Sequence, residues 1–158
     1  MNDQTMKEND AITGSLAECY VTIDDERYNF MQMIDFEAKW ETSINEIPIL
    51  GRTTKGNKPG ISKGTFSGKA HYNQSVMRKL MYKYKQTGKA VYFDIQVTNE
   101  DPTSNVGRQT IILKNCLSLS GTLAKFDVSS DYLDETIEGS FSDWEMPETF
   151  DILEGMQQ

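Results

Sequence analysis

Apolar and polar residues alternate along much of this 158-residue chain, and alternation with a period of two predicts β-strands. The longest alternating run, residues 27–42, predicts one extended strand with one face turned to a core. Its apolar face is expected to carry Tyr28, Phe30, Ile34, Phe36, Ala38 and Trp40, and its other face Met31, Met33, Asp35, Glu37, Lys39 and Glu41. Further strands are expected at residues 15–24, 65–72, 90–100, 108–121, 122–128 and 136–144.

One segment has the periodicity of a helix instead. In SVMRKLMYKYKQTG, residues 75–88, apolar positions recur at the spacing of a helix face. Ser75 suits the N-cap and Gly88 suits the position after the last turn, so we expect a helix over residues 75–87. Residues 129–135 are expected to form a short helical turn. The pattern predicts a mostly-β or α+β fold, a β-barrel-like sandwich of about seven or eight strands with one flanking helix.

The length of the chain favours one domain, which we place at residues 14–146. Residues 1–13 are polar and predict a flexible N-terminal arm, and residues 147–158 form an acidic C-terminal tail. No apolar run approaches the roughly 18 residues of a membrane helix, and the N-terminus has no apolar signal-peptide core. We therefore expect a protein that is made and kept in a cytoplasm, or that leaves it by an unusual route, without stable membrane association.

The stretch GRTTKGNKPGISKG, residues 51–64, predicts a long loop between two strands. Its glycines and bases are Gly51, Gly56, Gly60 and Gly64, with Arg52, Lys55, Lys58 and Lys63. Gly51 and Gly56 have the spacing of a phosphate-binding loop, but Asn57 stands where that motif has lysine, and a strand follows where it needs a helix. Loops longer than about 12 residues are usually functional or disordered, so the stretch needs another explanation.

Charge is divided unevenly along the chain, whose net charge is −8. Between Ile47 and Phe93 there are ten basic residues and no acidic one, whereas all 24 acids and only six bases lie elsewhere. Such a division gives one molecule both a basic segment and an acidic remainder, which attract each other in two copies of the chain. It favours association with nucleic acid or with another copy of the chain, and the acidity of the remainder argues against a dedicated nucleic-acid binder.

Candidate chemistry is sparse. His71 is the only histidine, so a site built from several histidines within one chain is excluded. Cys19 and Cys116 lack the spacing of a zinc site and are expected to be buried, reduced thiols. We predict no catalytic residue, no metal site and no cofactor.

Several stretches together resemble a known family. They are IPILGRTTKGNKPGISKGTFSG (residues 47–68) and HYNQSVMRKLMYKYKQTGKAVYFDIQVTNEDPTSNVGRQTIILKNC (residues 71–116). They resemble the tail tube proteins of contractile phage tails, of the XkdM type found in phage-like elements, over roughly residues 10–150. The resemblance implies a β-barrel-like sandwich with one helix, a fold shared with the type VI secretion tube protein Hcp.

The resemblance also implies an assembly. Six copies would form a ring whose strands combine into one β-barrel around a channel, and rings would stack head to tail inside a contractile sheath. The implied partners are other copies of the chain, the tail sheath protein, the tape measure protein, and the baseplate and tail terminator proteins. DNA would be only a passing cargo. The implied location is the bacterial host cytoplasm during assembly and afterwards the virion or tail-like particle.

Two candidate surfaces follow from this resemblance. The first is an assembly loop at residues 51–64 that would contact neighbouring subunits or rings, with candidate residues Leu50, Gly51, Arg52, Lys55, Gly56, Lys58, Gly60, Lys63 and Gly64. The second is the lining of the channel, for which the polar strand faces are the candidates: Asp35, Glu37, Lys39 and Glu41, and Thr136, Glu138, Ser140 and Ser142. A mainly acidic lining would repel DNA phosphates and let DNA slide.

Other interpretations stay open at this point. A phage virion, a defective prophage and a killing tailocin share these features. An Hcp-like secretion tube is the nearest alternative of the same class. A monomeric ligand-binding β-barrel would need a closed apolar cavity, and a nucleic-acid-binding module would bind DNA as a monomer in a salt-dependent way.

Overall fold

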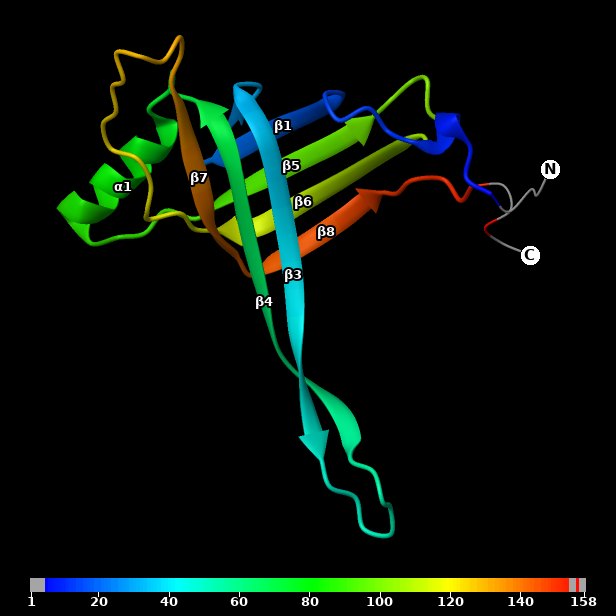
Figure 1. Ribbon diagram of the computed structural model, residues 1–158. Helices are drawn as coiled ribbons and strands as arrows, with labels where there is room; N and C mark the ends of the chain where they lie inside the picture. Colours follow the sequence, from blue (N-terminus) through cyan, green and yellow to red (C-terminus); the bar gives the residue numbers. More distant parts are fainter. Residues whose placement is uncertain (1–4, 154–155, 157–158) are drawn as a thin grey trace.

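The computed structural model describes residues 5–153 and residue 156. Two antiparallel sheets form the body of the molecule (Figure 1). The larger sheet has the strand order β2 (Glu26–Asn29), β1 (Ala17–Ile23), β5 (Phe93–Glu100), β6 (Arg108–Cys116) and β8 (Asp143–Glu148). The smaller sheet has the order β3 (Met33–Ile47), β4 (Gly56–His71) and β7 (Asp134–Phe141). A short 3₁₀ helix, η1 (Glu8–Asp10), precedes them.

The core lies between the two sheets. Val21, Ile95 and Leu113 enter it from the larger sheet, and Phe66 and Ile137 enter it from the smaller one. All five are buried, at alternate positions of their strands, because side chains of a strand point to opposite faces in turn. The predicted mostly-β sandwich with one helix is confirmed.

The predicted helix is also confirmed. Helix α1 spans Val76–Thr87 and buries Met77 and Leu80 against the end of the core. Gly88 ends it in the left-handed conformation, with φ of 70°, and donates its N–H to the carbonyl of Tyr84. Ser75 occupies the N-cap position, although its side chain makes no capping hydrogen bond. Among the described residues, no helix is long and apolar enough to cross a membrane.

The predicted strand at residues 27–42 is two strands. The chain turns between β2 and β3, and a β-bulge lies between Met33 and Asp35. Because a bulge adds one residue, it exchanges the faces of the residues before and after it. Met33 therefore packs against the core, whereas Ile34, expected on the apolar face, is 49% exposed.

The loop between β6 and β7 differs from the sequence-based expectation. The sequence predicts a strand at residues 122–128 and a helical turn at residues 129–135, but no strand or helix forms between Cys116 and Asp134. Only isolated bridges, Leu117 to Ser140 and Gly121 to Ile137, tie the start of this loop to β7. In the part of the chain that the structure describes, no further strand pairs with this loop, and its Leu123, Phe126 and Val128 are exposed.

The described part of the N-terminal segment is held against the body. Asn9 accepts the N–H of Asn105, Asp10 accepts the side-chain amide of Asn105, and Thr13 donates its N–H to Asp101. Asp101 also accepts the N–H and the hydroxyl of Thr103. These hydrogen bonds lower the pKa of Asp101 well below its usual value, and they anchor residues 9–13, which the sequence placed in a flexible arm.

Candidate assembly surfaces

The smaller sheet turns a polar face to the outside, and this face joins the two predicted polar strand faces. Strand pairing aligns them in four rows: Asp35–Lys69–Thr136, Glu37–Ser67–Glu138, Lys39–Thr65–Ser140 and Glu41–Lys63. β4 lies in the middle and supplies residues that were not among the candidates, Thr65, Ser67 and Lys69. Ser142 lies beyond the end of β7 and is not part of the rows.

The charge of this face is mixed rather than mainly acidic. The four rows carry four carboxylates and three lysines, and the Lys39 ammonium lies 3.6 Å from the Glu37 carboxylate. The expectation of an acidic lining considered only β3 and β7. Once β4 is placed between them, Lys63 and Lys69 change the net charge of the rows from −3 to −1.

The most prominent feature is a hairpin that projects from the body (Figure 1). Strand β7 ends at Phe141, opposite Gly64, so no third strand of the described residues lies beside residues 42–62 of β3 and β4. We call residues 42–62 the hairpin arm. At about 3.3 Å per residue, it extends roughly 30 Å beyond the sheet.

The sequence placed a loop at residues 51–64, but only its first five residues lie outside a strand. β4 begins at Gly56 and pairs with Ile47, so Gly56, Lys58, Gly60, Lys63 and Gly64 are strand residues. The pairing satisfies backbone groups that a long loop would leave to water. Leu50, Gly51, Arg52 and Lys55 form the tip, where Gly51 has φ of 84°, a conformation that favours glycine.

Gly64, which the sequence placed in a loop, has a packing role within β4. A Cβ atom at this position would lie 2.5 Å from Cε2 of Phe141. The Phe141 ring lies against the strand at this point and stacks on Trp40, with ring centroids 5.8 Å apart. The absence of a side chain at Gly64 therefore lets a buried aromatic ring cross β4.

The hairpin arm is apolar as well as basic. Leu50 is 103% exposed, Ile61 86% and Ile44 70%, although each is a residue type that proteins usually bury. Three bases, Arg52, Lys55 and Lys58, accompany a single acid, Glu46, whose carboxylate lies 3.9 Å from the Lys55 ammonium. The run IPIL at residues 47–50 was the signal in the sequence for this apolar character, beside the more conspicuous lysines.

The smaller sheet also has an open edge. β3 pairs with β4 along one side, and within the described chain no strand pairs with its other side over its 15 residues. Long unpaired edges invite strands of other chains, and monomeric proteins usually cover or shorten them. The opposite edge, at β7, is partly covered: Leu117 and Ser140 exchange both backbone hydrogen bonds.

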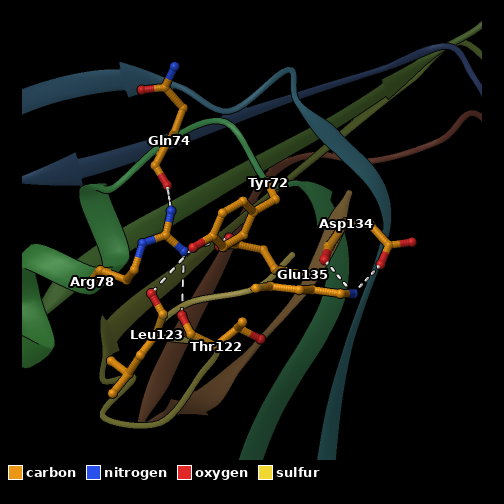
Figure 2. A network of polar contacts seen from close by, with 8 residues as sticks. Tyr72, Gln74, Arg78, Thr122, Leu123, Asp134 and Glu135 are labelled. Atoms are coloured by element: carbon orange, nitrogen blue, oxygen red, sulfur yellow. Dashed lines mark hydrogen bonds and ion pairs between the residues drawn. The ribbon is translucent and has the colours of Figure 1, made fainter. Parts of the chain in front are cut away.

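A polar network fixes the helix to the smaller sheet (Figure 2). Arg78 of α1 donates from Nη1 to Oε2 of Glu135 at 2.6 Å and to the carbonyl of Thr122, and its Nη2 donates to the carbonyl of Gln74. The guanidinium also lies over the Tyr72 ring, 4.5 Å from its centroid. Both ion-pair side chains are largely buried, with 17% exposure for Arg78 and 9% for Glu135.

Two of the larger recesses on the surface of the body have a largely apolar lining, whereas a third, of about 450 Å³, lies on the polar outer face of the smaller sheet beside Glu37, Lys39 and Glu138. The first, which we call the β1–β3 cleft, has a volume of about 320 Å³ and is lined by Glu18, Cys19, Met31, Ile34, Asp35 and Val97, among others. The second, the helix groove, has a volume of about 660 Å³ and lies between α1 and residues 119–123. Burial raises the pKa of the Cys19 thiol to about 11, so this wall of the cleft is uncharged.

The two cysteines are free thiols. Cys116 is completely buried, and desolvation raises its pKa to about 12. Cys19 is half-buried at the cleft. Thiols with raised pKa values are poor nucleophiles at neutral pH, because the thiolate is the reactive form.

Comparison with known proteins gives a consistent result. A family model described as "Phage tail tube protein" matches residues 4–148. The Phage-like element PBSX protein XkdM of Bacillus subtilis (strain 168) is 31% identical over 113 residues, which are 72% of this chain and 77% of that protein.

Solved structures share the fold at low sequence identity. A chain of the PVC sheath–tube complex, an extracellular contractile injection system in its extended state, gives a TM-score of 0.61 at 16% identity, covering 81% of this chain and 86% of that one. The SPP1 tail tube gives a TM-score of 0.61 at 10% identity, covering 90% and 81%.

Proposed function

The chain belongs to the phage tail tube protein family, and we propose that it is the subunit of a hollow tube made of stacked rings. The resemblance noted in the sequence is thereby confirmed at the level of the family. The ring is hexameric in this proposal, and the tube lies inside a contractile sheath of a phage tail or a tail-like particle.

The open edge of β3 is the observation that carries the proposal. In a ring, this edge pairs with the other edge of the smaller sheet in the next subunit, where residues 117–121 lie beside β7. Such β-augmentation satisfies the free backbone groups of β3 and joins the small sheets of all subunits into one closed barrel. A closed barrel has no remaining edge, which accounts for the edge that β3 leaves uncovered in the monomer over residues 33–41, before the hairpin arm.

The polar outer face of the smaller sheet lines the channel in this arrangement. Its carboxylates and lysines are interleaved, so the lining offers DNA neither a continuous basic track nor strong repulsion. DNA is therefore a passing cargo where the particle is a true phage. The further partners are the sheath, tape measure, baseplate and tail terminator proteins, and assembly takes place in the host cytoplasm.

The proposal is tested by electron microscopy of the purified chain, with light scattering across a salt series. We expect rings or tubes with a central channel. The key variant replaces residues 43–61 with Asn-Gly, a dipeptide that closes tight hairpins, between Thr42 and Ser62. These two residues already pair, and their hydroxyls lie 2.8 Å apart. We expect a folded monomer with an unchanged far-UV spectrum that forms no tubes.

A matched control puts the same dipeptide at the turn between β1 and β2. Asp24 and Asp25 both have positive φ, 50° and 66°, which Asn-Gly adopts readily, so this variant should assemble normally. Normal tubes from the arm-deleted variant would contradict the role of the arm. A wild-type chain that stays monomeric at every salt concentration and in the presence of a baseplate, or that binds DNA as a monomer, would contradict the tube.

A further inference from the structure

The tip of the hairpin arm exposes both an apolar side chain and a basic side chain. Leu50 is fully exposed, and Arg52 makes no ion pair within the described part of the chain. From Ile47 to Lys58 the chain has three bases and no acid. The surface that receives this tip must therefore offer both apolar contact and carboxylates.

The two recesses with an apolar lining differ in this respect, and the third, on the outer face of the smaller sheet, has Lys39 beside Glu37 and Glu138. The helix groove has apolar lining residues that include Met81 and Leu123, but its charged residues are the bases Arg78, Lys79 and Lys85. The β1–β3 cleft also has an apolar lining, with Met31, Ile34 and Val97, but its charged residues are the acids Glu18 and Asp35. Both carboxylates are exposed, and neither forms an ion pair among the described residues.

We propose that the β1–β3 cleft receives the tip of the hairpin arm of another copy of the chain. Leu50 enters beside Met31 and Ile34, and the bases of the tip face Glu18 and Asp35. Ile34 is exposed here because of the bulge between Met33 and Asp35, so the bulge prepares an apolar contact for the neighbour. This inference rests on the proposed function and names the acceptor surface that the function requires.

The tip cannot reach the cleft of its own subunit. Ile34 and Asp35 lie at the start of β3, and the tip follows its end, so strand geometry separates them by roughly 45 Å. Figure 1 shows the arm pointing away from the body. Donor and acceptor are thus different surfaces at opposite ends of one strand, which makes the contact heterologous and head to tail. Pairing between sheet edges closes each ring. The contact between tip and cleft then joins each ring to the next one, in the direction of β3.

Disulfide trapping between two cysteine variants tests the acceptor. One variant carries Leu50→Cys and the other carries Ile34→Cys, both in a Cys19→Ala background that removes the thiol already in the cleft and leaves only the completely buried Cys116. The two are mixed, assembled into tubes and oxidised under mild conditions. We expect a cross-linked dimer containing one chain of each kind, at least tenfold above the level in unassembled mixtures.

The helix groove supplies the matched control. Leu123 is 71% exposed at that groove, so Leu123→Cys replaces Ile34→Cys in a parallel mixture and should give no cross-link above background. Tubes in which the Leu50→Cys chain cross-links to the Leu123→Cys chain, or to neither partner, would overturn the cleft as acceptor while leaving the tube proposal intact. Failure of the wild-type chain to form any tube would overturn the proposed function, and this inference with it.

Charge exchange gives a second, independent measurement. Arg52→Glu with Lys55→Glu should prevent assembly, and adding Glu18→Lys to the same chain should restore it at least in part. Adding Glu145→Lys instead, an equal charge change on β8, should not restore tubes. Equal rescue by both lysines would show that net charge matters rather than the cleft.

Discussion

At the scale of single residues, the Arg78–Glu135 pair is the interaction whose loss should cost most. Both side chains are largely buried, and removing one partner from such a pair leaves an uncompensated charge. We expect Arg78→Met to lower the free energy of unfolding of the monomer by about 3 kcal/mol in urea denaturation. Lys79→Met changes an exposed neighbour on the same helix and should stay within about 0.5 kcal/mol of wild type.

A second substitution separates loss of charge from loss of packing. In Arg78→Met with Glu135→Leu, no buried carboxylate remains, so a large part of the lost stability should return. If Arg78→Met proves no more destabilising than Lys79→Met, the pair contributes little. Since the network of Arg78 also holds the carbonyl of Thr122, the loop before β7 should become more susceptible to proteolysis in the single variant.

Gly64 tests whether glycine provides packing space or flexibility. We expect Gly64→Ala to lower the free energy of unfolding by about 1–3 kcal/mol, because its Cβ would overlap the Phe141 ring. Gly14→Ala is the control, since a Cβ there meets no atom within 4 Å and its φ is not positive. Thermal or urea unfolding of the monomers compares the two, and equal stability would mean that Phe141 moves aside freely.

At the scale of elements, periodicity predicted most of the structure but not its interruptions. The helix was predicted to within a residue, because its apolar stripe and Gly88 are local signals. The bulge at Met33 and the end of β7 opposite Gly64 depend on strand pairing, which no local pattern encodes.

The candidate surfaces, too, were predicted where local signals suffice and missed where strand pairing decides. The polar faces of β3 and β7 were predicted from alternation, but their junction through β4, and the lysines that β4 adds, follow only from the sheet order. The basic stretch at residues 51–64 was interpreted as a loop because glycines suggest one, yet most of it pairs as a strand. The cleft was not predicted, since it combines residues of β1, β3 and β5.

At the scale of the whole molecule, the uneven charge has a structural counterpart. Of the ten bases between Ile47 and Phe93, only Lys55 and Arg78 form ion pairs among the described residues. The other eight stay available for partners, so the division of charge serves contacts between molecules more than the fold of one. Such exposed contacts weaken as salt screens them, over a Debye length of about 8 Å at physiological ionic strength.

The lining of the channel can be tested by reversing charge without changing the fold. Glu37 and Glu138 share one row across the smaller sheet and are both exposed, so Glu37→Lys with Glu138→Lys should still assemble. The four rows would then carry five lysines and two carboxylates, and repetition around a ring would create a basic channel. We expect these tubes to retain short DNA that nuclease cannot digest, about tenfold above wild type, with retention falling steeply as salt rises.

Asp131→Lys with Glu145→Lys makes the same charge change away from this face, and DNA bound to those tubes should remain open to nuclease. Equal protection of DNA from nuclease in both variants would contradict the assignment of the outer face of the smaller sheet to the channel. Only an enclosed basic lining both binds DNA and shields it from nuclease.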